Sequence, residues 1–375
     1  MTDDLPEPDR VDGAPHPRET QNLFGQAEAE ANFLAAYNAG RLHHGWLISG
    51  PSGVGKATLA WRLARFMLAT PVADGGLFDP PAPDSLDIAP DHPVARRMSA
   101  RAEGRMFHLR RGLNEKETAY SADIRVDDVR RMKSFFTMSA ADGGRRAAII
   151  DAADDMNTAA ANALLKLLEE PPAGVTLFLI SHQPHRLLPT IRSRCRELRL
   201  SRLPADMLSK ALSAAGGTLA PSDALAMAEL AGGSVGEAFR LTNQDGLSVY
   251  AGLIRLMATL PRMDRAVALK LAETSAGRGA ETQFDLVVTL IDLFLARIAR
   301  AGATTTLPPE AAPGEASLIT RLGQPPGAGL AWANLAQSLT IRARRGRAVN
   351  LDPAALLMDM LLKIDDTAGT LLAQR

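Results

Sequence analysis

A glycine-rich turn between a short apolar segment and a helical segment constrains the fold of this chain most. The segment Gly45-Trp-Leu-Ile-Ser49 has the character of a buried strand, Gly50-Pro-Ser-Gly-Val-Gly-Lys56 follows it, and residues 57–69 have a helical pattern. Such a turn binds phosphate because its backbone N–H groups wrap the oxygens, the helix N-terminus adds positive potential and the lysine reaches the outer phosphates. We therefore predict a phosphate-binding loop rather than an ordinary strand–helix turn, with four nucleotide-binding residues: Gly50, Gly53, Gly55 and Lys56.

The loop departs from the usual motif at one position. The residue after the lysine is normally Ser or Thr, whose hydroxyl binds Mg²⁺. Here that residue is Ala57, and Thr58 comes one place later. One step along a helix rotates a side chain by about 100°. Thr58 therefore belongs to the predicted site as part of a degenerate one, and we do not expect it to replace the missing ligand.

Apolar strands alternate with helical segments up to about residue 203. Further strands are expected at residues 106–110, 147–151, 175–181 and 196–200. This alternation predicts a parallel sheet with helices on both faces. Asp151 ends one of the strands, where phosphate-loop ATPases hold Mg²⁺ with an aspartate, although a capping role is the alternative. The next position, where a catalytic Glu is expected, is Ala152.

The chain of 375 residues is long enough for two or three domains. Residues 1–19 are rich in proline and charge, and we expect a disordered tail. The α/β domain is expected to span residues 20–203, with a proline-rich, loop-rich insertion at 70–105. Residues 204–245 and 246–375 are helical in pattern and predict a small helical domain followed by a larger one.

Composition excludes several classes of protein. The 42 basic side chains balance the 42 acidic ones, so no global positive field predicts nucleic acid or an anionic membrane as a direct partner. The single cysteine, Cys195, excludes an internal disulfide and a cysteine-rich zinc module. No apolar run approaches the ~20 residues that span a bilayer, and the N-terminus has no signal-peptide core. We expect a cytoplasmic protein without a membrane partner.

Two further strings carry a family resemblance. Thr190-Ile-Arg-Ser-Arg-Cys195 taken alone is most often a solvated basic surface, but it follows Asn162-Ala-Leu-Leu-Lys-Leu-Leu-Glu-Glu-Pro-Pro172 and the phosphate loop. Together the three strings resemble the clamp-loader branch of the AAA+ ATPases over roughly residues 20–200. The resemblance implies an α/β fold in which a phosphate-loop, parallel-sheet AAA+ domain precedes a helical lid (204–245) and an all-helical collar domain (246–375).

The resemblance also implies a division of labour. Motor subunits of that branch hydrolyse ATP, whereas a non-motor subunit supplies an arginine to its neighbour. This chain is similar to the second kind because Ala57 and Ala152 replace the metal-binding hydroxyl and the catalytic carboxylate. In Gly233-Ser-Val-Gly-Glu-Ala238, which resembles the lid's sensor segment, Gly236 stands where motors carry an arginine. Arg194 would then be a catalytic arginine finger acting in trans, and the chain would have no ATPase activity of its own.

The implied partners are the motor subunits and a delta subunit, which form a hetero-oligomeric ring with this chain. The resemblance implies that this ring places the sliding clamp on primed DNA. The ring would be part of the DNA polymerase III holoenzyme, a DNA-directed DNA polymerase. No cofactor is required, but residual ATP or ADP binding without hydrolysis stays open. Many relatives carry a cysteine-bound zinc module in the position of residues 70–105; this segment has His92 and no cysteine, so we expect no zinc. Two alternatives remain, namely an ATP-hydrolysing AAA+ motor or remodeller, and a scaffold with a vestigial Ser-Arg-Cys segment.

Overall fold

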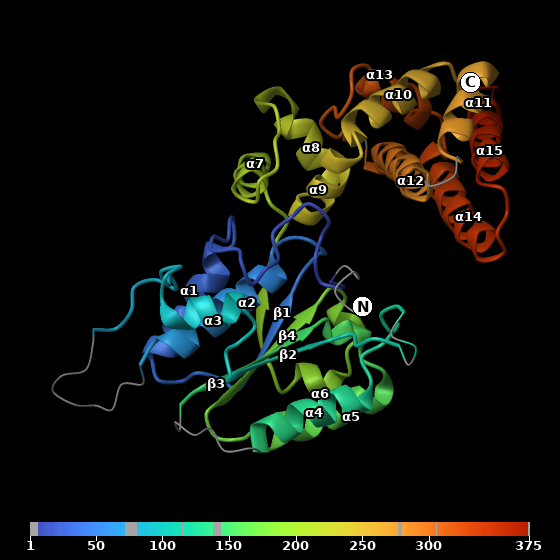
Figure 1. Ribbon diagram of the computed structural model, residues 1–375. Coiled ribbons are helices and arrows are strands. Elements are labelled where there is room, and N and C mark those ends of the chain that lie inside the picture. Colours follow the sequence, from blue (N-terminus) through green and yellow to red (C-terminus); the bar gives the residue numbers. More distant parts are fainter. Residues whose placement is uncertain are drawn as a thin grey trace. The chain divides into compact units, whose positions relative to one another are not determined.

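The computed structural model describes residues 7–373 except 72–80, 115, 117, 138–143, 277–279 and 305 (Figure 1). By its internal contacts the chain divides into two compact units. The first holds the residues up to Gly217 together with Gly233–Gly236, and the second holds Thr218–Gly232 and Glu237–Arg375. The boundary falls inside the expected lid, so the division into lid and collar stays a prediction.

The first unit is built on a five-stranded sheet in which every pair is parallel, as predicted. The order β2-β3-β4-β1-β5 places the first strand next to last, between the fourth and the fifth. The strands are β1 Gly45–Ser49, β2 Met106–Arg110, β3 Arg146–Asp151, β4 Val175–Ser181 and β5 Arg196–Arg199. β1 and β4 are buried along their whole length, which is expected of central strands covered on both faces.

Helices cover both faces of this sheet (Figure 1). Because successive side chains of a strand point to opposite faces, Trp46 and Ile48 pack with one group of helices while Leu47 packs with the other. The first group is α1 Ala27–Asn38, α2 Lys56–Ala69 and α3 Pro93–Ser99; the second is α4 Val126–Thr137, α5 Thr158–Glu169 and α6 Pro189–Arg192. Short 3₁₀ turns lie at Ala153–Asp155 and Pro184–Arg186, and α7 Ala205–Ala214 completes the unit.

The described part of the second unit is helical apart from its connections. After a 3₁₀ turn at Pro221–Asp223 it contains α8 Ala224–Ala231, most of α9 Val235–Asn243, α10 Gly246–Ala258, α11 Arg265–Thr274, α12 Glu281–Thr304, α13 Glu315–Gly323, α14 Ala328–Ala348 and α15 Pro353–Ala373. Gly302 and Gly329 let α12 and α14 approach closely, since a Cβ on Gly302 would lie 2.9 Å from the backbone nitrogen of Gly329. Among the described helices of the chain, none is both long and apolar enough to cross a membrane.

The N-terminal segment differs from the expected disordered tail. His16 and Arg18 are buried, with 0% and 7% of their surface exposed. The expectation that this segment has nothing to bury is therefore wrong for residues 7–19, and residues 1–6 lie outside the described part.

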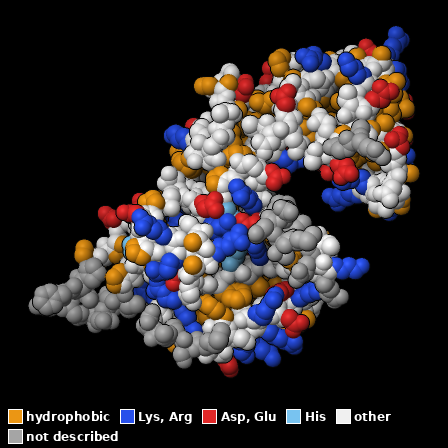
Figure 2. All heavy atoms as spheres, in the orientation of Figure 1, with side chains coloured by type: hydrophobic (Ala, Val, Ile, Leu, Met, Phe, Trp, Pro, Cys, Tyr) orange, Lys and Arg blue, Asp and Glu red, His pale blue; other side chains and the backbone are white. Residues whose placement is uncertain are grey.

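The 70–105 insertion contains α3. The His92 ring caps the first turn of this helix by accepting a hydrogen bond from the Val94 N–H. Residues 72–80 of the insertion also lie outside the described part. On the face seen in Figure 2, acidic side chains lie among the basic ones, as the balanced charge suggests.

Candidate nucleotide site

The predicted phosphate loop leaves the carboxyl end of β1 and enters α2. At Gly53 the backbone has φ +73°, and a Cβ there would collide with the Ser234 hydroxyl. The Gly53 carbonyl accepts hydrogen bonds from the N–H groups of Val235 and Gly236, at 2.9 and 3.3 Å. The segment that resembles the lid sensor therefore lies directly against the loop, and position 236 brings no side chain to it.

Lys56 is almost completely buried in this loop, with 3% of its surface exposed. Its ammonium donates one hydrogen bond to the Gly50 carbonyl at 2.8 Å and another to the Pro51 carbonyl. Burial lowers the pKa of Lys56 to about 8, although the charges of Asp151 and Asp154 oppose that shift. The lysine that should reach toward phosphates is thus hydrogen bonded to the carbonyls of its own loop.

Two aspartates lie near the phosphate loop: Asp151 ends β3, and Asp154 lies in the 3₁₀ turn that follows it. Burial, reinforced by the charge of Asp9, raises the pKa of Asp151 to about 7, whereas Lys56 opposes this shift. Asp154 was not singled out from the sequence. Its carboxylate accepts hydrogen bonds from the Ser181 hydroxyl at 2.7 Å and from the backbone N–H groups of His182 and Gln183. Asp154 therefore ties the turn after β3 to the end of β4.

The structure brings most of the predicted site together at the carboxyl edge of the sheet. The loop glycines, Lys56 and Asp151 meet there, and Thr58 lies half-buried on the first turn of α2. These residues fit a nucleotide only in part. Glycine N–H groups and an ammonium suit phosphates, but Ala57 offers no hydroxyl for a metal ion.

Arg194 lies at the opposite edge. A Cβ on Gly45, the first residue of β1, would come within 3.2 Å of the Arg194 carbonyl and 3.3 Å of the Cys195 sulfur. The phosphate loop starts after the last residue of the same strand, so about 15 Å of strand separates the two. The Arg194 guanidinium forms an ion pair with Glu169 at 2.9 Å and donates to the Thr190 carbonyl at 3.1 Å. Its side chain is 37% exposed.

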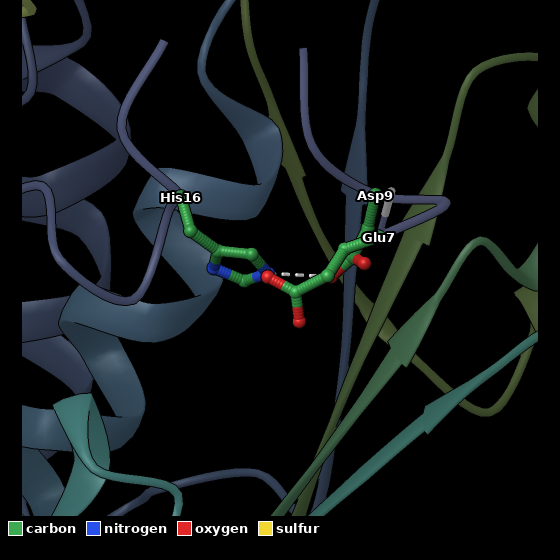
Figure 3. A group of neighbouring side chains, drawn as sticks. All are labelled: Glu7, Asp9 and His16. Carbon is green, nitrogen blue, oxygen red and sulfur yellow. Dashed lines mark hydrogen bonds and ion pairs between the residues drawn. The ribbon is translucent and has the colours of Figure 1, made fainter. Parts of the chain in front are cut away.

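A cluster that the sequence did not reveal joins the N-terminal segment to β2. His16 points toward Asp9 and Glu7, and its Nε2 lies 2.8 Å from an Asp9 oxygen (Figure 3). By residue type these three side chains could hold a metal ion. However, their carboxylates already form ion pairs with three arginines, namely Arg18, Arg101 and Arg110. Such pairing neutralises the carboxylates and favours a structural role for this cluster over a metal centre.

Comparisons with known proteins agree with this geometry. A family model described as "DNA polymerase III, delta subunit" matches residues 25–204. A DNA polymerase III subunit delta' of Pseudomonas aeruginosa is 41% identical over 152 residues, which are 40% of this chain and 41% of that protein. Over these residues the chain is similar to the DNA polymerase III delta-prime subunits. The matches agree with the predicted family, and the parallel sheet with helices on both faces confirms the α/β class.

Other relatives match over different lengths. The delta' subunit of Escherichia coli K12 is 32% identical over 225 residues, 60% of this chain and 62% of that protein. A gamma/tau subunit of Mycobacterium bovis is 30% identical over 190 residues, 50% of this chain and 29% of that protein. The chain thus spans less than two thirds of the length of each of these three relatives.

Proposed function

We propose that this chain is a non-motor subunit of the DNA polymerase III clamp loader, which helps to place the sliding clamp on primed DNA and supplies Arg194 to the ATP site of a neighbouring motor subunit. The observation that supports this role most is the location of Arg194. It is partly exposed at the edge of the sheet opposite the chain's own phosphate loop, so a partner's site is the one it can serve.

The chemistry of the finger follows from its side chain. A guanidinium placed against a γ-phosphate stabilises the charge that develops in the transition state, and such a group contributes roughly 10³–10⁵ in rate. Glu169 and the Thr190 carbonyl orient the Arg194 fork in the free chain. The planar fork can contact two oxygens at once, which a lysine ammonium cannot.

The chain's own site is proposed to be inactive in hydrolysis. Ala57 and Ala152 remove the metal-binding hydroxyl and the carboxylate that would polarise water, and Gly236 brings no charge from the sensor segment. A bound nucleotide would meet the loop N–H groups and Lys56.

We propose that the protein needs no cofactor and no zinc. We also propose that it works in the cytoplasm and joins the motor and delta subunits in a ring. Elemental analysis tests the zinc statement.

The rival function is an ATP-hydrolysing motor, which the intact Lys56 and Asp151 favour. Measurement of Mg²⁺-dependent turnover by the isolated chain separates the two functions. We expect no turnover above background; a rate near ~1 s⁻¹, the low end of ordinary enzymes, would support the motor instead.

The trans role is tested by Arg194→Ala in the assembled complex. The variant should assemble normally, because a partly exposed ion pair contributes little to stability. Total ATPase should fall in part and clamp loading should fall further, since one motor site loses its finger. Arg194→Lys should restore little, and Arg192→Ala, two residues away and exposed, is the matched control. Clamp loading at the wild-type rate by the Arg194→Ala complex would exclude the finger and leave the scaffold alternative.

A further inference from the structure

The N-terminal segment crosses the edge of the sheet at which a nucleotide would arrive. Asp9 is hydrogen bonded to Arg110, the last residue of β2, whose register partner is Asp151 at the end of β3. Two residues later, a Val11 methyl lies 3.5 Å from the position of a Cβ on Gly236. The backbone of Gly236 in turn lies 3.1 Å from a Cβ placed on Gly53 in the phosphate loop. Residues 9–11 thus extend from the Asp151 side of the site to the loop.

The same segment packs against and is hydrogen bonded to α2, the helix that begins at Lys56. The His16 ring packs edge-on against Trp61 of α2, with ring centres 5.8 Å apart. One turn further along α2, the Arg65 guanidinium donates to the Arg18 carbonyl at 2.6 Å. These contacts bury His16 completely and give the segment a fixed attachment beside the loop.

The acidic side chains of the segment form its other attachment. Glu7 accepts hydrogen bonds from Arg18 and Arg110, each at about 3 Å, and also pairs with Arg101. Asp9 bridges His16 and Arg110, and 4% of its side chain is exposed. Although burial opposes ionisation, the His16 hydrogen bond and the charges of His108 and Arg110 hold the pKa of Asp9 well below its ordinary value. Asp9 is therefore a buried anion next to Asp151.

We infer that residues 7–18, called here the N-terminal cap, close the phosphate loop of this chain, and that a nucleoside di- or triphosphate binds at Lys56 only when the cap moves away. Two features oppose simultaneous occupancy. The backbone from Asp9 to Val11 spans the edge between Asp151 and the loop, and the buried Asp9 side chain lies beside Asp151 and pairs with Arg110 at that strand end. With the cap in place, the Lys56 ammonium donates hydrogen bonds to the Gly50 and Pro51 carbonyls. The inference concerns the chain's own site and is independent of Arg194.

The decisive variant removes the acidic attachment without removing buried apolar surface. Glu7→Gln combined with Asp9→Asn weakens the pairs with Arg18, Arg101 and Arg110, and it keeps the shapes of both side chains. Asp84→Asn combined with Asp91→Asn is the matched control, because it makes the same change in net charge at two exposed positions of the first unit. A chain that lacks residues 1–18 and is otherwise intact is the second variant.

The measurement is the binding of a fluorescent ADP and a fluorescent non-hydrolysable ATP analogue, with and without Mg²⁺. We expect the Glu7→Gln/Asp9→Asn chain and the truncated chain to bind at least tenfold more tightly than wild type. The control pair should bind as wild type does, and adding Lys56→Ala to the cap variant should abolish the gain. Equal affinity for wild type and both cap variants, or no detectable binding by either of them, would overturn the inference.

Hydrogen exchange of the wild-type chain gives a second readout. Saturating nucleotide should speed exchange in residues 7–18 if the cap must leave, while exchange in α5 stays the same. Unchanged protection of the cap at saturating nucleotide would show that both can occupy the site and would refute the inference. Circular dichroism shows whether the truncated chain folds; if it does not, the double substitution and this exchange experiment decide.

Discussion

Lys56 is a buried cation whose hydrogen-bond acceptors are two loop carbonyls. Burial lowers its pKa to about 8, against the ordinary value of 10.5. The unfolded chain therefore binds more protons between about pH 8 and 10.5, so the stability of the fold should rise with pH across that window. Below pH 8 the charged side chain costs on the order of 3 kcal/mol.

We accordingly expect Lys56→Met to melt at a higher temperature than wild type at pH 7, because the substitution removes the cost of burying the charge. The difference should shrink as the pH rises from 8 to 10. Thermal unfolding followed by circular dichroism at several pH values measures it, with the exposed Lys166→Met as control. A difference that is the same at every pH would show that burial of the charge is not its cause.

Cys195 gives a second prediction at this scale. Burial raises the pKa of its thiol to about 12, and its sulfur packs near the start of β1. Because the thiolate is the reactive form, the native protein should react very slowly with a thiol-specific disulfide reagent at pH 8. One thiol per chain should react at once in denaturant, which serves as the control. Rapid stoichiometric reaction of the native chain would mean that this turn opens readily.

Among the elements, the contact between β1 and the turn that carries Arg194 depends on a glycine. A Cβ on Gly45 would lie 2.9 Å from a Leu168 methyl and 3.2 Å from the Arg194 carbonyl. We expect Gly45→Ala to cost about 1–3 kcal/mol through overpacking and to speed the reaction of Cys195. Urea unfolding measures the first effect. Gly104→Ala is the matched control, since nothing lies within 4 Å of a Cβ there; equal effects of both substitutions would contradict the proposed contact.

Elements whose structure depends on local pattern were predictable from the sequence. The five strands appear within one residue of their expected bounds, because apolar runs between turns fix buried strands. The loop glycines, Lys56 and Asp151 were predictable because strand ends of a parallel sheet share an edge. The N-terminal cap was not: its proline and charge resemble a disordered tail, and its burial depends on Arg110 and Trp61, both more than forty positions away in the sequence. The hydrogen bonds between Asp154 and the end of β4 were not predictable either, because they join residues 27 to 29 positions apart.

At the scale of the whole molecule, each unit has its own core and its own optical probe. Trp46 and Trp61 are buried in the first unit, and Trp332, buried on α14, is in the second. The second unit also has a buried polar centre. Glu315, with 0% of its surface exposed, accepts hydrogen bonds from Tyr250 at 2.6 Å, from Arg297 at 2.7 Å and from the Ala311 N–H at 2.7 Å.

Removal of Glu315 should therefore destabilise the second unit selectively. Glu315→Ala leaves the Arg297 guanidinium buried without this carboxylate, a change that typically costs about 3–5 kcal/mol. Urea unfolding followed by fluorescence should show a lower midpoint in a background that keeps Trp332 alone. The midpoint should be unchanged in a Trp332→Phe background, where Trp46 and Trp61 report on the first unit. Glu273→Ala, at an exposed position on α11, controls for the loss of a negative charge. If the urea midpoint falls in both backgrounds, the two units unfold as one cooperative system. The proposed role of Arg194 would then have to be tested only in chains whose helical unit is intact.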